Sequence, residues 1–177
     1  MQEQAIENAA TRSVKFMGIN HLAMVTGDMD KTVRFYRDVL GMPLVATIGN
    51  KAFRHYFFNM GQGNTIAFFE WPGITTGPAK LSGVPARDGR HFDHISFCVE
   101  NLDALHDLQA RLQAHQVEVT RVVDHQFIQS IYFDDPNGIS LEASYWVIDV
   151  AEAPVWGDPN PVAAVKEQMA ELVAAHK

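Results

Sequence analysis

An internal repeat constrains this chain more than any other feature of its sequence. His21 and His94 each lie in an apolar run, and the same order of patterns follows each of them: strand, helix, strand, strand, strand. Thr47 follows His21 by the same number of residues as Thr120 follows His94. A repeat of about 73 residues that carries the same elements twice predicts two copies of one βαβββ unit.

Apolar runs and turn residues predict where the elements of each unit lie. The strands of the first unit are expected at residues 16–25, 43–48, 53–59 and 65–71. Those of the second unit are expected at residues 92–99, 117–124, 127–133 and 139–146. A helix follows the first strand of each unit, capped by Asp28 or Asp30 in one and by Asn101 in the other, and Gly41 is placed to end the first helix.

The fold class that follows is α+β: two tandem βαβββ modules forming a curved, barrel-like mixed sheet around a cavity, plus a C-terminal helix. The expected organisation is a flexible arm (1–13), a first module (14–72), a loop rich in glycine and proline (73–90), a second module (91–147) and an extension (148–177). Asn160-Pro161 begins the helix of the extension. Its apolar stripe needs a surface to cover, either its own domain or another subunit.

Composition limits the partners and the compartment. The chain has 177 residues, 47% of them hydrophobic, and a net charge of −7, which is enough apolar material for a core and argues against nucleic acid as a partner. The single cysteine, Cys98, lies in an apolar run and is expected to be buried; it cannot form an internal disulfide, which suits a reducing cytoplasm. The N-terminus lacks the pattern of a signal peptide, and no apolar run approaches the ~20 residues that span a bilayer. We therefore expect a cytoplasmic protein with no membrane partner.

The stretch around Asp135-Pro136-Asn137-Gly138 predicts a tight hairpin between two apolar strands. Glu142 lies inside the returning strand, with Leu141 and Ala143 beside it. A carboxylate in such a strand either faces solvent or finds a cation, because burying it alone is costly.

Two histidines and this glutamate form a candidate metal site. His21 and His94 occupy equivalent places in equivalent first strands, and Glu142 lies in the last strand of the second module. If first and last strands are neighbours in each sheet, all three side chains point into one cavity. Two imidazoles and one carboxylate leave open positions on a divalent ion, as in non-haem Fe(II) sites. We expect Fe(II) first, with Mn(II), Zn(II) or Ni(II) as alternatives.

The phrases 18–21, 35–42, 93–97 and 132–138 together give the chain a family resemblance. It resembles the vicinal oxygen chelate superfamily, which includes glyoxalase I, bleomycin resistance proteins, fosfomycin-resistance thiol transferases, methylmalonyl-CoA epimerases and type I extradiol dioxygenases. The resemblance covers about residues 14–147 and implies paired βαβββ modules around a divalent metal ion.

Within that superfamily the residues most resemble an extradiol dioxygenase of one domain. Glyoxalase I and the epimerases have a fourth ligand, glutamate, where this chain has Ala67; Glu70, three residues on, should face the other side of the strand. By resemblance, His125 and Tyr132 would contact the oxygens of a catechol. The acid–base histidine of those enzymes is replaced by Asn64, and His55 could reach the cavity from the next strand.

These assignments leave alternatives open. Tyr132 could simply pack, and His125 and His55 could be surface residues. Four aromatic residues could line a pocket or lie in the core: Phe53, Phe57, Phe68 and Trp71.

The sequence therefore predicts a metal-dependent, ring-cleaving dioxygenase. It would act on a small molecule with adjacent oxygens and form a homodimer. A glyoxalase-like isomerase or lyase, which gains if Glu70 binds metal, and a metal-free binding protein are the alternatives.

Overall fold

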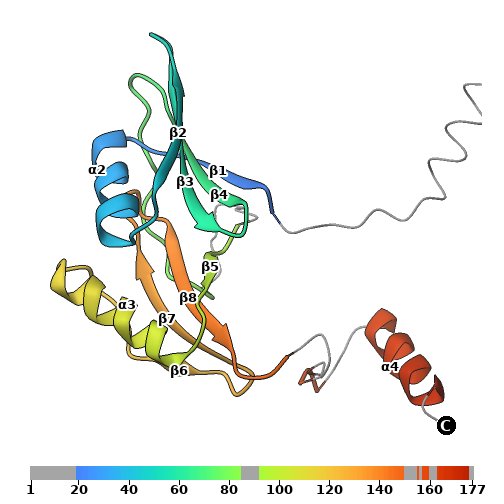
Figure 1. Ribbon diagram of the computed structural model, residues 1–177. Helices are drawn as coiled ribbons and strands as arrows, with labels where there is room; N and C mark the ends of the chain where they lie inside the picture. The colour runs from blue at the N-terminus through green and yellow to red at the C-terminus, as the bar shows by residue number, and fades with distance from the viewer. Residues whose placement is uncertain (1–18, 85–91, 150–154, 156, 160–162, 176–177) are drawn as a thin grey trace, which may run out of the picture.

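The structure is a computed structural model that describes residues 19–84, 92–149, 155, 157–159 and 163–175. The predicted N-terminal arm, the first residues of the first strand and the helix start at Asn160-Pro161 lie outside the described residues. Figure 1 shows two sheets, one above the other, with the helices of both modules on the same side.

Each module folds into a four-stranded mixed sheet, and the two sheets have the same strand order (Figure 1). The first contains β1 (His21–Val25), β2 (Leu44–Gly49), β3 (Arg54–Gly61) and β4 (Asn64–Glu70), in the order β1-β4-β3-β2. The second contains β5 (Ile95–Cys98), β6 (Val123–Asp124), β7 (Ile128–Asp134) and β8 (Ser140–Trp146), in the order β5-β8-β7-β6. First and last strands are parallel neighbours in both, which confirms the predicted repeat. The two curved sheets remain separate and do not close into one barrel.

The prediction of a strand at residues 117–124 is wrong except for its last two residues. Val119 forms only an isolated bridge to Phe133, and the regular strand β6 has two residues. Thr120 gives the reason: its hydroxyl accepts the N–H of Tyr132 at 2.9 Å. A side chain that takes the place of a backbone acceptor interrupts the ladder.

The two predicted helices form where their caps indicate. Asp28 caps α2 (Met29–Val33) by accepting the N–H of Lys31, which decides between the two candidate aspartates. The same helix continues as η1 (Arg34–Val39), a π-helical stretch, and Gly41 follows with a φ of 73°. In the second module, Asn101 caps α3 (Leu102–Ala114) as predicted.

Side chains of both modules share one core on the helix side of the sheets. Tyr36 of η1 contacts the rings of Phe58 and Phe68, and all three are fully buried. Leu105 of α3 and Ile131 of β7 belong to the same cluster. Phe68 is therefore a core residue and does not line a pocket, whereas the other face of each sheet carries no helix.

The hairpin turn of the second module forms the joint between the modules. Asn137 is buried and donates to the hydroxyl of Thr32 at 3.1 Å, while the hydroxyl of Thr26 donates to Asn137 at 2.7 Å. The phenol of Tyr36 donates to Asp135 at 3.2 Å, and burial raises the pKa of that carboxyl. This polar joint fixes one module against the start of α2 in the other.

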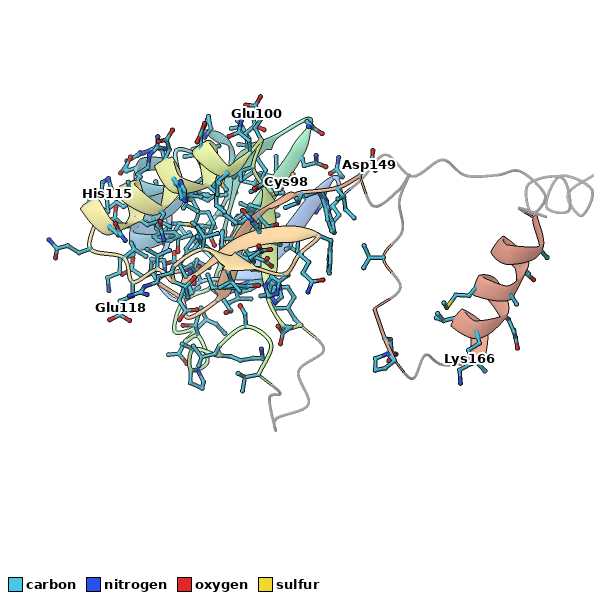
Figure 2. All side chains as sticks on the ribbon, turned by 90° about the horizontal axis from the view of Figure 1, so that it is seen from below. Cys98, Glu100, His115, Glu118, Asp149 and Lys166 are labelled. Atoms are coloured by element: carbon cyan, nitrogen blue, oxygen red, sulfur yellow. The ribbon has the colours of Figure 1, made fainter. Side chains whose placement is uncertain are left out.

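The last helix, α4 (Ala163–Ala175), lies apart from both modules in Figures 1 and 2. No helix within the described ranges is long and apolar enough to cross a membrane.

Candidate metal centre

The candidate site residues lie on the faces of the two sheets that carry no helix, which we call the open faces. Residues paired on neighbouring strands point to the same face of a sheet. In the first module, His21 pairs with Thr65, and Phe57 and His55 follow on the same side, two and four residues further along the strands. In the second, Glu142 lies between Ser96 and Tyr132. The register thus puts His21, His55, Glu142 and Tyr132 on the open faces. His94 contacts Glu142 there, and His125 contacts Tyr132.

In the second module, His94 and Glu142 already meet. Nε2 of His94 lies 2.8 Å from Oε2 of Glu142, and the hydroxyl of Ser130 donates to the other carboxylate oxygen. Glu142 is 5% exposed, so it does not face solvent. This contact brings an imidazole nitrogen and a carboxylate oxygen side by side, the two kinds of atom that bind a divalent ion in such sites. This donor pair fits a divalent ion.

Each candidate histidine is oriented by the residue before it. Nδ1 of His94 lies 2.7 Å from Oδ2 of Asp93, and Nδ1 of His21 lies 2.9 Å from Oδ1 of Asn20. An oxygen at Nδ1 fixes the orientation of the ring and leaves Nε2 as the nitrogen that would bind a metal. The two modules therefore share one device for orienting a ligand. Its sequence signal was the equivalent place of Asn20 and Asp93 in the repeat.

The register confirms Ala67 as the counterpart of Glu142. Glu142 lies opposite Ser96, two residues after His94, and Ala67 lies opposite Ala23, two residues after His21.

The carboxylate of Glu70 lies on the other side of the sheet and already has protein partners there. It accepts the N–H of Met29 at 2.9 Å and pairs with Arg54, so it holds the start of α2. The first module therefore has no carboxylate at the place where a fourth ligand would have to lie.

The three predicted ligands do not all meet within one chain. Across the residues that the structure describes, no group of three or more His, Cys, Asp or Glu side chains is placed to hold a metal ion. His94 and Glu142 lie together in the second sheet, while His21 lies in the first. We call His94 with Glu142, and His21 by itself, the two candidate half-sites of the chain; that they bind a metal ion stays a prediction.

Tyr132 and His125 lie beside the half-site of the second module. Tyr132 is directly opposite Glu142, and its hydroxyl lies 2.9 Å from Nε2 of His125. Burial, and then the charge of Glu142, raise the pKa of Tyr132, so its phenol keeps its proton at neutral pH. Tyr132 also borders a cavity of about 380 Å³. The other lining residues are Leu81, Ser82, Val117, Glu118, Val119, Thr120, Phe133, Asp134 and Ser140.

His55 is buried, and the expectation of a surface residue is wrong. It is 8% exposed, its ring stacks on Phe69 at 3.5 Å, and its Nε2 has no hydrogen-bond partner among the described residues. Burial, and then the nearby His21, lower the pKa of His55, which keeps the imidazole neutral. An unpartnered buried nitrogen on the open face is a group that a ligand can satisfy.

Aromatic rings cover much of the open face of the first module. Phe69 stacks on Trp71 at 5.0 Å and contacts Phe53 at 6.0 Å, and Phe57 contacts the ring of His21 at 5.9 Å. Sequence reasoning missed Phe69. Its alternation with Ala67 along β4 would have placed it on this face.

Cys98 is exposed, so the prediction that it is buried is wrong. It pairs with Ser144 in the second sheet and lies on the open face of β5, where Figure 2 labels it. The apolar run around it alternates between faces, with Ile95 and Phe97 turned to the core.

Comparison with known proteins agrees with this architecture. The sequence model described as "Glyoxalase/Bleomycin resistance protein/Dioxygenase superfamily" matches residues 18–143. A solved structure of a glyoxylase/bleomycin resistance protein/dioxygenase domain from Frankia sp. EAN1pec superposes with a TM-score of 0.64 at 23% identity, covering 75% of this chain and 99% of that one. Listeria monocytogenes FosX, a fosfomycin resistance protein solved as a mutant with Mn(II) and 1S,2S-dihydroxypropylphosphonic acid, gives a TM-score of 0.57 at 19% identity, over 78% of this chain and 98% of FosX.

Two curated relatives carry different activities in their names. MhqO of Bacillus subtilis, a candidate ring-cleaving dioxygenase, is 29% identical over 86% of this chain and 47% of its own length. The chain therefore spans about half of that relative. The metallothiol transferase FosB of Lysinibacillus sphaericus is 27% identical over 70% of this chain and 79% of FosB.

Proposed function

The chain belongs to the glyoxalase/bleomycin resistance protein/dioxygenase superfamily, and we propose that it is an extradiol ring-cleaving dioxygenase with His21, His94 and Glu142 as metal ligands. Members of this superfamily bind divalent metals, and the FosX structure contains Mn(II). The observation that carries the proposal is the hydrogen-bonded pair of Tyr132 and His125, on the same open face as Glu142 and next to it in register.

The metal centre forms between two copies of the chain. One chain holds a half-site with two donors, His94 and Glu142, and a separate half-site with one donor, His21. The open face around β1 is uncovered, with His21, Ala23 and Val25 exposed. A second copy whose second module faces this surface would complete the three ligands and cover the exposed residues. This assembly gives a homodimer with two equivalent sites.

The substrate is a catechol, whose two adjacent hydroxyl groups suit a pair of open metal positions. The metal ion, Fe(II) in this proposal, would supply Lewis acidity toward the catechol oxygens and access to O₂. The overall reaction adds both atoms of O₂ to the ring and breaks the carbon–carbon bond beside a hydroxyl group. The aromatic rings of the first module provide an apolar wall for the substrate ring.

The polar residues of the open faces handle protons. Tyr132, protonated at neutral pH, donates a hydrogen bond to the substrate phenolate, and His125 orients the Tyr132 hydroxyl. His55 is neutral and has an unsatisfied Nε2, so it can accept a proton from the second hydroxyl group.

An isomerase or lyase of the glyoxalase kind has less support. That chemistry, by resemblance, uses a carboxylate from the first module, but Ala67 occupies the place and Glu70 holds helix α2.

A thiol transferase is the second candidate. The observation that favours it is coverage, because the chain matches 79% of FosB but 47% of MhqO. The described residues offer little to hold a phosphonate, since Arg54 is paired with Glu70.

One experiment separates these functions. The protein is purified without added metal, its metal content is measured, and the anaerobic protein is loaded with Fe(II) and given a panel of catechols. We expect about one metal ion per chain, uptake of one O₂ per catechol and a yellow product. Metal without O₂ uptake, together with thiol transfer to fosfomycin, would establish the second candidate instead. Absence of metal binding would contradict both.

A further inference from the structure

A half-buried lysine lies behind the second half-site. The side chain of Lys80, in the segment that connects the two modules, is 12% exposed. Its Nζ forms an ion pair with Asp93 and donates to the carbonyl of Leu81 at 2.9 Å. A lysine that is this far buried needs a partner of opposite charge, and Asp93 is that partner.

Asp93 links this lysine to a predicted ligand. One carboxylate oxygen pairs with Lys80. The other accepts the N–H of Gly83 at 2.8 Å and contacts Nδ1 of His94 at 2.7 Å. The position of the carboxylate, and with it the orientation of the imidazole, therefore depends on the connecting segment.

The same segment is attached to the sheet at two further points. The hydroxyls of Ser82 and Ser140 lie 2.7 Å apart. Ala79 packs on Gly138, whose φ of 76° suits glycine and where an added Cβ would lie 3.0 Å from the Ala79 backbone. These contacts bring Leu81 and Ser82 to the wall of the 380 Å³ cavity beside Tyr132.

The described residues of the first module show no counterpart of this arrangement. Asn20 takes the place of Asp93 behind His21, and an amide carries no charge for a lysine to pair with. The orienting device is the same in the two modules, but only one copy is tied by an ion pair to a neighbouring segment.

We propose that residues 79–83 form a strap in which Lys80, acting through Asp93, positions His94 for the metal ion, while Leu81 and Ser82 bound the substrate cavity. This inference rests on the proposed metal centre. Lys80 is a positioning residue and touches neither metal nor substrate. A carboxylate behind a ligand histidine fixes the ring and strengthens its Nε2 as a donor, and loss of such support typically weakens metal binding by about 10- to 100-fold.

The test measures Mn²⁺ affinity of the full chain by titration calorimetry. Lys80→Met removes the charge and keeps the length of the side chain, Lys80→Arg keeps the charge, and Lys51→Met is the control at an exposed loop lysine. We expect Lys80→Met to bind Mn²⁺ about 10- to 100-fold more weakly. Lys80→Arg should recover most of the affinity, and Lys51→Met should match the wild type. The visible spectrum of the Co²⁺-loaded protein should change in Lys80→Met and return in Lys80→Arg.

A second variant covers the case in which Lys80→Met does not fold. Asp93→Asn copies Asn20 of the first module, so it keeps an acceptor for His94 and removes the charge that Lys80 pairs with. It should also weaken Mn²⁺ binding.

The outcomes separate the strap from the metal centre. If the wild type binds Mn²⁺ and these variants bind it equally well, the strap is wrong and the metal centre stands. If the wild type binds no divalent metal, the metal centre fails and the strap fails with it.

Discussion

The open faces of the two modules differ although their frames are the same. Both sheets have one strand order, both place a histidine at the start of the first strand, and both orient its Nδ1 by the preceding residue. The first face continues with aromatic rings and Ala67, whereas the second continues with Glu142, Ser130 and Tyr132.

This difference teaches how a repeat can divide the work of one site. A common register keeps equivalent positions facing the same way, so a single substitution changes what a module contributes. In the proposed site, with alanine at the position of Glu142, the first module would supply one donor, an apolar wall and His55. The second would supply two donors and the pair of Tyr132 and His125.

Removing the carboxylate of the second module should have the largest effect. In Glu142→Ala, we expect divalent metal affinity to fall by about 100-fold or more, because one of the three proposed ligands is lost. Metal content after dialysis and titration calorimetry measure this. Glu100→Ala is the control, since Glu100 is exposed in the same module. Full metal occupancy in Glu142→Ala would show that the two modules do not differ as ligand donors.

Removing one hydroxyl from the polar face should slow catalysis. In Tyr132→Phe, we expect kcat for catechol to fall by about 100-fold, because a proton donor to the substrate is lost while the ring remains. Tyr145→Phe is the matched control, since its hydroxyl donates to Gln129 and not to a site residue. Oxygen uptake measures both variants, and an unchanged kcat in Tyr132→Phe would mean that this ring only packs.

Removing a buried hydrogen-bonding group from the joint between the modules should lower the stability of the protein. Asn137→Ala leaves Thr26 and Thr32 without their buried amide partner, so we expect the free energy of unfolding to fall by about 2 kcal/mol. Asn50→Ala, at an exposed loop, should change it little. Urea denaturation measures both. Equal stability of the two variants would argue against the polar joint.

Replacing the buried imidazole on the aromatic face by an apolar ring should have the smallest effect, a small change in stability. His55→Phe removes a buried nitrogen without a partner, and we expect a gain of about 1 kcal/mol at neutral pH.

The pH dependence of this variant sharpens the prediction. The pKa of His55 is lowered in the folded state, so the unfolded chain binds a proton more readily. Wild-type stability should therefore fall as the pH drops below about 6.5, and His55→Phe should lose less over that range. Thermal unfolding between pH 5 and 8 tests the sign, and a greater loss in the variant would refute it.

The arrangement of strands and helices in the two modules could be predicted from the sequence. The repeat, the helix caps and the alternation of apolar residues predicted two βαβββ modules, and the counterpart of Glu142 was already Ala67. These features are local or periodic, and side-chain alternation along a strand fixes the face without knowledge of distant contacts.

The contacts that each face of a sheet makes became visible in the three-dimensional arrangement alone. It buried His55 and exposed Cys98, gave Glu70 to helix α2, and shortened the strand at 117–124 through the hydroxyl of Thr120. It also separated His21 from His94 and Glu142 and placed Lys80 behind Asp93. The reason is that burial, ion pairs and convergence on a metal depend on residues far apart in the chain, whose meeting is set by packing and not by any local pattern.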